Sequence, residues 1–334
     1  MAESRIVVLI DDDVPLPGEQ AERICRLSSR IQLLHGITKD NLRSAHVIYT
    51  AQAAFDPADA LCLRWVQTPS VAVNHLQSAP IANSGIPIAN VRGAYAIAVA
   101  ECALGLMLTL MRRLHICRSM ELQGQWPPDK SVVQGENCYG KTIGIIGYGS
   151  TGRHIARLTQ ALGMKVMACK RRVEIKPEGV VFGFPNVGDP EGRIPEAWFG
   201  PEQLDQMLKR IDVAVVTLPL TNATRGLIGR RELEALPSHA YLLNVGRGGV
   251  VDEPALIDAL QAGRFAGAGL DVFASEPLPA DSLLWKLSNV VILPHIASYT
   301  KDQVYLAAEV LIENLRRFLS KQSLVNLVDM TTGY

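Results

Sequence analysis

The chain lacks an excess of either charge. Its 334 residues include 33 Lys and Arg and 33 Asp and Glu, so the formal net charge is zero. This balance argues against a protein whose main task is to hold a nucleic-acid backbone, which needs a basic face. A hydrophobic fraction of 48% and a charged fraction of 20% exclude a disordered chain. The length predicts roughly two domains.

The sequence also lacks a long uninterrupted hydrophobic run. Its most apolar stretch, residues 93–111, contains Glu101 and ends at Arg112. A membrane span needs about 20 consecutive apolar residues, so this stretch predicts a buried helix, and no membrane partner is expected. The short apolar run near the N-terminus leads into Asp11–Asp13, which is typical of a strand rather than a signal peptide.

Cysteine patterning is absent as well. The six cysteines show no Cys-x-x-Cys pair and no regular spacing. Neither a disulfide framework nor a metal site is indicated, and a reduced, cytoplasmic protein is expected.

What is present is a pair of blocks in which strand patterns alternate with helix patterns. In the first block, strands are predicted at residues 5–10, 45–50, 71–73 and 87–91, and helices at 18–29 and 56–63. In the second block, strands are predicted at residues 142–147, 165–169, 212–219, 240–245, 267–272 and 290–293, and a helix at 150–162. This alternation predicts an α/β fold with parallel sheets.

The remaining segments complete this outline. Residues 101–120 are predicted to form one long helix, residues 301–319 a terminal helix, and residues 177–199 a surface insertion rich in Gly and Pro. Asp56 is predicted to cap the helical turn that begins at Pro57.

A glycine-rich turn joins a predicted strand to a predicted helix at Gly-Tyr-Gly-Ser-Thr-Gly, residues 147–152. In such a G-x-G-x-x-G turn, Gly147 makes the tight bend, Gly149 admits a pyrophosphate, and Gly152 lets the helix pack on the strand. The helix N-terminus adds N–H groups that favour an anion. The alternative is a turn that serves packing alone. We assign to a dinucleotide cofactor the residues Gly147, Gly149, Ser150, Thr151 and Gly152.

The end of the following strand indicates which dinucleotide is bound. An acidic residue about 20 positions past the motif would accept a hydrogen bond from the ribose 2′-OH of NAD. Lys170, Arg171 and Arg172 occupy this place instead, and the first carboxylate is Glu174. Three cations attract the 2′-phosphate of NADP, and the missing acid removes the repulsion that would reject it. NADP is therefore expected over NAD, with a solvated basic patch as the alternative.

Three further motifs accompany the glycine turn: residues 244–253 (NVGRGGVVDE), 269–277 (GLDVFASEP) and 294–298 (PHIAS). Together with Leu218, Pro219 and Thr224, they resemble the D-isomer-specific 2-hydroxyacid dehydrogenase family. In type the chain is most similar to NADPH-dependent glyoxylate and hydroxypyruvate reductases. The resemblance extends over most of the chain.

The resemblance assigns the chemistry to three side chains. Arg247 would hold the substrate carboxylate and polarise the carbonyl, because its planar guanidinium offers several donors. His295 would exchange the proton with the substrate oxygen, because imidazole titrates near neutral pH. Glu276 would pair with His295 and orient its ring. A structural role is the alternative for each of them.

The resemblance also implies further cofactor contacts. Asp271 would accept a hydrogen bond from the nicotinamide carboxamide, with loop capping as the alternative. Contacts that are mostly apolar or made by the backbone are expected from Leu218, Pro219, Thr224, Val245, Gly246, Ala297 and Ser298.

A loop of the first domain is expected to bind the substrate carboxylate. In similar enzymes this loop ends in Gly-Val-Asp and offers backbone N–H groups. The matching residues here are Val71, Ala72, Val73 and Asn74, and Ala72 preserves the donors if its φ is negative. The candidate substrate-binding residues are Val71, Ala72, Val73, Arg247 and His295. Two further residues remain open: Arg92 is either a substrate contact or a hinge ion pair, and Trp285 either packs in the core, which is favoured, or lies at the rim of the pocket.

The resemblance implies two Rossmann-like or flavodoxin-like domains with an active-site cleft between them. Residues 105–299 would form the dinucleotide-binding domain, and residues 1–104 and 300–334 the substrate-binding domain. The protein would be a homodimer that reduces a small 2-oxoacid, such as glyoxylate or hydroxypyruvate, to the D-2-hydroxyacid with NADPH.

Three alternative functions remain. One is a nicotinamide-sensing protein with little chemistry, and a second is a phosphoglycerate-type dehydrogenase that uses NAD. The third is another Rossmann enzyme such as a methyltransferase, which would leave the motifs at 244–253 and 294–298 without a role.

Overall fold

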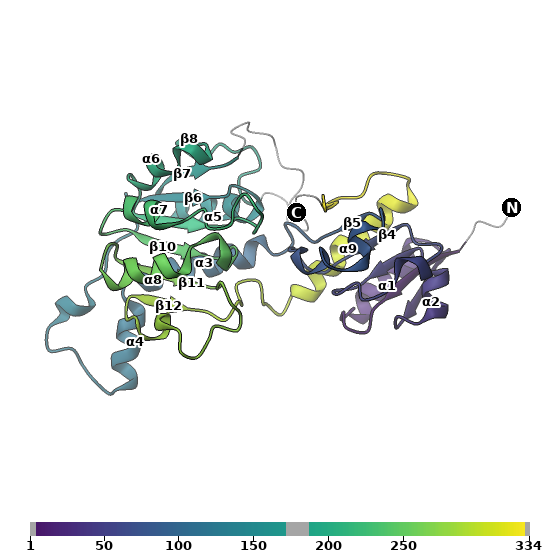
Figure 1. Cartoon of the computed structure of the whole chain (residues 1–334), viewed down its shortest axis with the longest axis horizontal. Helices are drawn as coiled ribbons and strands as arrows, with labels where there is room; N and C mark the ends of the chain where they lie inside the picture. Colours follow the sequence, from purple (N-terminus) through teal and green to yellow (C-terminus); the bar gives the residue numbers. More distant parts are fainter. Residues whose placement is uncertain (1–4, 172–186, 331–334) are drawn as a thin grey trace. The chain divides into compact units, whose positions relative to one another are not determined.

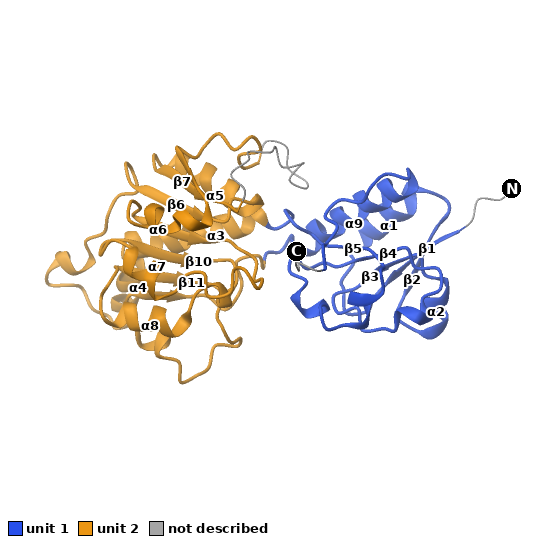
Figure 2. Ribbon diagram, turned by 45° about the horizontal axis from the view of Figure 1, so that its top comes forward, with its two compact units in different colours: residues 1–95, 181–184, 300–334 blue, residues 96–180, 185–299 orange. Residues whose placement is uncertain are grey.

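The computed structural model describes residues 5–171 and 187–330, which form two compact units (Figure 1, Figure 2). Of these residues, the first unit holds 5–95 and 300–330, and the second unit holds 96–171 and 187–299. The second unit is thus inserted into the first. Arg172 and residues 177–186 of the expected insertion lie outside the described residues.

The first unit is built on a parallel sheet whose described strands have the order β2-β1-β3-β4-β5. Its strands are β1 (Ile6–Ile10), β2 (Ile31–His35), β3 (Val47–Tyr49), β4 (Trp65–Gln67) and β5 (Ile88–Ala89). Its helices are α1 (Gly18–Leu27), α2 (Lys39–Ser44) and α9 (Gln303–Leu319). The order is that of a flavodoxin-like fold.

The sequence of β1 explains how this sheet is covered on both faces. Val8 and Ile10 share a buried cluster with Ile24 of α1 and Leu311 of α9. Leu9 points to the opposite face and packs in a second cluster with a leucine of α2. Because side chains alternate along a strand, an uninterrupted apolar run fits a strand that is buried on both faces.

The second unit contains a larger parallel sheet, whose described strands have the order β12-β11-β10-β9-β6-β7-β8. The strands are β6 (Thr142–Ile146), β7 (Lys165–Cys169), β8 (Ala197–Phe199), β9 (Val213–Val216), β10 (Tyr241–Asn244), β11 (Gly267–Leu270) and β12 (Val290–Ile292). The helices are α3 (Ala96–Met111), α4 (Leu114–Leu122), α5 (Ser150–Ala161), α6 (Leu204–Leu208), α7 (Arg230–Ala235) and α8 (Glu253–Gln261). Helices α3 and α5 share a buried cluster with one face of the sheet, and α6, α7 and α8 share another with the opposite face. Two parallel-sheet α/β units confirm the predicted fold class.

Short 3-10 turns occupy several of the connections. They are η1 (Pro57–Asp59), η2 (Asn74–Leu76), η3 (Pro80–Asn83), η4 (Lys130–Val133), η5 (Pro201–Gln203), η6 (Gly248–Val250) and η7 (Leu283–Lys286). The predicted cap of η1 is confirmed, because the Asp56 carboxylate accepts a hydrogen bond from the N–H of Ala58 at 2.9 Å. The helix predicted over residues 56–63 is only this single turn.

The boundary between the units differs from the expected one. The second unit begins at Ala96 rather than at residue 105, because α3 is one continuous helix that packs on α5 and on the strands of the second sheet. The long helix predicted over residues 101–120 is divided into α3 and α4. Arg113 adopts a left-handed conformation with φ of 52°, and the N–H of Glu136 donates to the carbonyl of Met111 at 2.7 Å.

Other predictions are also corrected by the structure. Residues 71–73 do not form a strand, because a side chain rather than a neighbouring strand binds them: Asn90 Nδ2 donates to the Val71 carbonyl at 2.8 Å. Residues 197–199 are strand β8 rather than a surface insertion. Trp285 is 53% exposed and donates its Nε1–H to the Pro279 carbonyl, so it is not a core residue. Among the described residues, no helix has both the length and the hydrophobicity that a membrane span needs.

Candidate active site

The strand order of the second unit reverses between β6 and β9. Chain continuation runs from β6 to β7 on one side and from β9 to β10 on the other. In open parallel sheets, ligands bind beyond the carboxyl ends of the strands at such a reversal. Sequence-predicted site residues follow these carboxyl ends: Gly147 after β6, Leu218 after β9, Arg247 after β10, Asp271 after β11 and His295 after β12.

Two of the three glycines in the turn after β6 are closely surrounded by other atoms. Gly147 has φ of +104°, and a β-carbon there would lie 2.9 Å from Thr217 Oγ1. Thr217 in turn donates its hydroxyl to the Gly147 carbonyl at 2.5 Å, which joins β6 to β9 across the reversal. A β-carbon on Gly152 would lie 2.3 Å from the Gly147 carbonyl oxygen. Only glycine therefore allows α5 to begin so close to the turn.

Gly149 differs from its two neighbours, because a β-carbon on it would meet nothing within 4 Å. Open space therefore lies beside the turn, next to the first residues of α5. The first N–H groups of a helix have no partner within the helix and favour an anion. A pyrophosphate can approach the backbone here without displacing a side chain, so these residues fit a dinucleotide.

The loop after β10 is held rigidly around Arg247. The buried side chain of Asn244 donates to the Arg247 carbonyl at 3.1 Å and accepts from the N–H of Gly246 at 3.1 Å. A β-carbon on Gly248 would overlap the Phe273 backbone, and one on Gly246 would lie 2.8 Å from the Leu218 carbonyl oxygen. Sequence reasoning quoted Asn244 only as part of a motif and missed this role. A polar residue at the end of a buried apolar strand was the available signal.

Arg247 lies in a largely desolvated and electronegative place. Its Nη1 donates to the Gly246 carbonyl at 2.6 Å. Burial lowers the pKa of Arg247, while the carboxylates of Glu276 and Asp271 act in the opposite direction. A guanidinium remains protonated in proteins, so a cation faces this edge of the sheet.

His295 and Glu276 are brought together although they are separated along the chain. Nδ1 of His295 lies 2.6 Å from Oε2 of Glu276. The other oxygen, Oε1, accepts the N–H of Phe273 at 2.9 Å, which fixes the carboxylate. The side chains of His295 and Glu276 are 44% and 35% exposed, so the pair is accessible to a ligand.

Asp271 is buried, and its carboxylate is turned toward the loop that follows β12. It accepts hydrogen bonds from the N–H of Ile296 at 2.8 Å and of Ala297 at 3.1 Å. The Asp271 carbonyl also accepts the N–H of His295 at 2.9 Å. The structure therefore shows the loop-capping role that sequence analysis held as its alternative.

The other predicted cofactor residues shape the same edge of the sheet. Thr224 donates its hydroxyl to the Pro219 carbonyl at 2.7 Å, so it closes the turn after β9. Lys170 follows β7, where its N–H donates to the Phe199 carbonyl at 3.0 Å. Arg171 is exposed beside it. Val245 and Ala297 are buried, and Leu218, Pro219 and Ser298 are half-buried.

The candidate substrate loop belongs to the first unit. Tyr95 donates its hydroxyl to the Pro69 carbonyl at 2.7 Å, and Asn90 holds the Val71 carbonyl, so the loop is anchored at both positions. Val73 is buried and Val71 is 36% exposed. Arg92 is exposed, and its carbonyl accepts a hydrogen bond from Asn326 at 2.8 Å.

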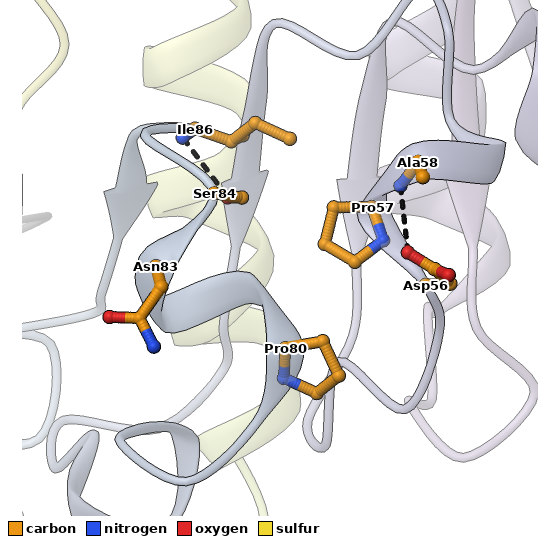
Figure 3. A pocket seen from close by; sticks show the side chains of 7 residues that line it. All are labelled: Asp56, Pro57, Ala58, Pro80, Asn83, Ser84 and Ile86. Carbon is orange, nitrogen blue, oxygen red and sulfur yellow. Dashed lines mark hydrogen bonds between the residues drawn. The ribbon is translucent and has the colours of Figure 1, made fainter.

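A hollow on the first unit offers no comparable chemistry (Figure 3). It is lined by Asp56, Pro57, Ala58, Pro80, Asn83, Ser84 and Ile86. Two of its polar side chains are used locally, because Asp56 accepts from the N–H of Ala58 and Ser84 accepts from the N–H of Ile86. Within residues 5–171 and 187–330, no group of three or more His, Cys, Asp or Glu side chains is placed to hold a metal ion.

Comparison with known proteins identifies the family. The family model "D-isomer specific 2-hydroxyacid dehydrogenase, NAD binding domain" matches residues 104–297. The chain belongs to the D-isomer specific 2-hydroxyacid dehydrogenase family. Members of this family are oxidoreductases that depend on NAD or NADP, and the matched region is their nicotinamide-dinucleotide-binding domain.

Relatives and solved structures of the family cover between 77% and 99% of the chain. A glyoxylate reductase from Thermococcus gammatolerans is 36% identical over 77% of this chain and 73% of its own length. A D-3-phosphoglycerate dehydrogenase from Methanocaldococcus jannaschii is 28% identical over 97% of this chain, which spans only 60% of that protein. The crystal structure of a family member from Xanthobacter autotrophicus, in complex with NADPH and MES, has a TM-score of 0.78. It shares 26% sequence identity and covers 99% of this chain and 100% of its own.

Proposed function

We propose that this protein reduces a small 2-oxoacid, such as glyoxylate or hydroxypyruvate, to the D-2-hydroxyacid with NADPH. The observation that carries the proposal is the 2.6 Å pair of His295 and Glu276. Glu276 lies in the loop after β11 and His295 in the loop after β12. These strands belong to the sheet whose strands β6 and β10 precede the glycine turn and Arg247. The glyoxylate reductase from Thermococcus gammatolerans supports the proposed substrate class.

The proposed mechanism divides the work among the three side chains. A bound nicotinamide would supply the hydride that reaches C2 of the 2-oxoacid. His295 protonates the carbonyl oxygen from Nε2, because Glu276 holds Nδ1 and thereby orients the ring. Arg247 holds the carboxylate and polarises the carbonyl through its planar donors. In the reverse direction His295 accepts the same proton.

Two further sets of residues are proposed to bind the ligands. Backbone N–H groups of the loop formed by Val71, Ala72 and Val73 hold the substrate carboxylate. Asp271 orients the nicotinamide carboxamide in addition to capping its own loop. Both roles are proposed for the protein with cofactor and substrate bound.

NADP is proposed as the preferred cofactor, with NAD as the weaker one. Lys170 and Arg171 follow β7, where the ribose of a dinucleotide lies in Rossmann folds, and Arg172 comes next in the sequence. In this proposal their charges hold the 2′-phosphate. The double variant Lys170→Asp/Arg171→Ala is expected to shift the ratio of kcat/KM toward NADH, and an unchanged ratio would remove these residues from the site.

A panel of 2-oxoacids, assayed with both NADPH and NADH, tests the proposed reaction. We expect glyoxylate or hydroxypyruvate to be reduced faster with NADPH. His295→Ala should lower kcat by about 100-fold or more, since general acid–base catalysis contributes this much, while the NADPH Kd stays unchanged. Turnover that survives this substitution would contradict the assigned role.

The same panel separates the alternatives. The similarity to the phosphoglycerate dehydrogenase from Methanocaldococcus jannaschii favours a phosphoglycerate-type dehydrogenase that uses NAD. Rapid oxidation of 3-phosphoglycerate with NAD by this chain would establish that alternative. Tight NADPH binding without turnover of any 2-oxoacid would favour a nicotinamide-sensing protein. We further propose that the protein acts in the cytoplasm as a homodimer joined through its second unit.

A further inference from the structure

Tyr148 is the residue between the first two glycines of the turn, and its side chain points into the protein. Its ring is 1% exposed. Its hydroxyl donates to Oδ2 of Asp189 at 2.7 Å. Asp189 is buried as well, and its carboxylate also accepts the N–H groups of Arg193 at 2.9 Å and Ile194 at 3.0 Å. A single carboxylate, 41 residues beyond Tyr148 in the chain, therefore joins the glycine turn to a distant segment.

Helix α5 binds the same segment from a second direction. Arg153 is 1% exposed, and its Nη1 donates to the carbonyls of Asp189 and Pro190. The guanidinium carbon of Arg153 also lies 5.4 Å from the centre of the Tyr148 ring. One helical turn later, Arg157 donates to the Gly188 carbonyl at 3.3 Å.

Strand β8 contributes a third contact. The ring of Trp198 meets the Tyr148 ring edge-on, with the centroids 4.9 Å apart and an angle of 76° between the planes. Tyr148 is thus held by a hydrogen bond, a cation and an aromatic edge, all within the second unit. Such aromatic and cation contacts stabilise a buried ring beyond the effect of burial alone.

This network adds to the hydrogen bonds that Gly147 makes with Thr217 and Cys169 and holds the residue between the two glycines. Gly147 and Gly149, which flank Tyr148, have no side chain to restrict the turn, and glycine loses more conformational freedom on ordering than any other residue. A turn that is already ordered in the free protein binds its ligand more tightly, because less freedom is lost on binding.

We propose that Tyr148 and Asp189 are a positioning pair that preorganises the glycine turn for the pyrophosphate of the dinucleotide. The segment from Gly188 to Ile194 is then a determinant of cofactor affinity, although it carries none of the cofactor motifs. This inference rests on the proposed cofactor binding. Neither residue is catalytic, because each acts through the turn.

The protonation of Tyr148 is consistent with this role. Burial, followed by the neighbouring Asp189 carboxylate, raises the pKa of the Tyr148 hydroxyl well above its ordinary value, against the opposing effect of Arg153. The hydroxyl therefore remains a donor throughout the neutral and mildly alkaline range.

Tyr148→Phe tests the proposal, because it removes the hydroxyl and keeps the buried ring. The matched control is Tyr241→Phe. Tyr241 is a buried tyrosine of the same unit, and its hydroxyl makes no hydrogen bond to the described residues. Three quantities are measured for both variants: the NADPH Kd by calorimetry, the kcat and KM values, and the hydrogen exchange of residues 147–156 in the cofactor-free protein.

We expect Tyr148→Phe to raise the NADPH Kd about tenfold, as the loss of one hydrogen bond to a charged group predicts. The KM for NADPH should rise with it, whereas kcat at saturating NADPH and the KM for the 2-oxoacid stay unchanged. Exchange at residues 147–156 should accelerate. Adding Tyr148→Phe to Asp189→Ala should change the NADPH Kd little beyond the effect of Asp189→Ala alone, because the hydrogen bond that Tyr148→Phe removes is already lost.

A lower Tm for Tyr148→Phe, with the NADPH Kd and the exchange at residues 147–156 equal to those of Tyr241→Phe, would overturn the proposal. The pair would then be a structural link only. The wild-type titration is a separate check: failure of the unmodified protein to bind NADPH or NADH would refute the proposed function itself, and this inference with it.

Discussion

His295 occupies a backbone conformation that few side chains adopt. Its φ is 55°, in the left-handed region, which costs free energy for a residue other than glycine. Two contacts hold it there: its N–H donates to the Asp271 carbonyl, and its ring contacts Glu276. The surrounding structure therefore determines the direction of the imidazole, which is what a proton donor requires.

Arg247→Gln tests the cation of the site. We expect the KM for the 2-oxoacid to rise and kcat/KM to fall about 100-fold, because a neutral amide cannot replace a charged pair of donors to a carboxylate. Steady-state kinetics with glyoxylate or hydroxypyruvate measure this, and direct titration checks that NADPH still binds. Arg264→Gln, at an exposed arginine of the same unit, is the control. Constants near those of the wild type would exclude Arg247 from the substrate site.

At the scale of elements, the turn between β6 and α5 offers two glycines with opposite surroundings. Gly152→Ala places a β-carbon 2.3 Å from the Gly147 carbonyl oxygen, so α5 must shift. We expect this variant to lose about 1–3 kcal/mol of stability, as overpacked sites do, and to bind NADPH more weakly. Thermal unfolding and NADPH titration measure the two effects.

Gly149→Ala is the matched variant in the same turn. Its β-carbon enters open space and its φ of −89° suits alanine, so Tm should not change. The NADPH Kd should rise nevertheless, because the added methyl group occupies the approach of the pyrophosphate. Equal Kd values for Gly149→Ala and the wild type would place the dinucleotide elsewhere.

The pairing of β1 with β3 contains a pH-sensitive contact. Nδ1 of His46 accepts a hydrogen bond from the N–H of Val7 at 3.2 Å, which requires an unprotonated nitrogen. Burial, together with the charge of Arg64, lowers the pKa of His46 in the folded protein. The unfolded chain therefore binds the proton more readily, so stability is lost as pH falls below 6.5, the ordinary pKa of a histidine.

We expect the Tm of the first unit to fall by about 2 °C more between pH 7.5 and pH 5.5 in the wild type than in His46→Gln. Glutamine offers an acceptor that does not titrate. Differential scanning calorimetry at the two pH values measures the difference, and equal shifts in both proteins would contradict the assignment.

At the scale of the whole molecule, large apolar side chains remain exposed on and after α4. Leu122 is 71% exposed and Trp126 is 84% exposed. A large exposed apolar patch often marks a site where a protein binds a partner. The proposed homodimer, joined through the second unit, would cover it.

The double variant Leu122→Lys/Trp126→Lys should convert the proposed dimer into a monomer, since two charges would have to be buried at the contact. Light scattering coupled to size-exclusion chromatography measures the mass. Leu61→Lys is the control, because Leu61 is 78% exposed on the first unit. A monomeric wild type, or a variant that stays dimeric, would refute this surface as the contact.

Much of the fold could be read from runs of apolar residues. The strands β6, β7 and β9 to β12 are largely uninterrupted apolar segments, and Gly147 after β6 and Asn244 at the end of β10 mark two of their ends. Shorter elements escaped: β4 has three residues and β8 follows a Gly- and Pro-rich stretch. The break at Arg113 also escaped, because it depends on Glu136, whose N–H binds the last carbonyl of α3.

The sequence by itself determined the residue types and their order: a glycine turn after a strand, and Arg247, Glu276 and His295 in motifs that name a family. Only the tertiary structure decided which of them meet. Parallel pairing of β10, β11 and β12 brings the ends of distant segments to one edge, where Glu276 reaches His295 and Asn244 fixes the Arg247 loop. The link from Tyr148 to Asp189 was equally invisible, because contacts between distant residues arise from packing and leave no local pattern in the chain.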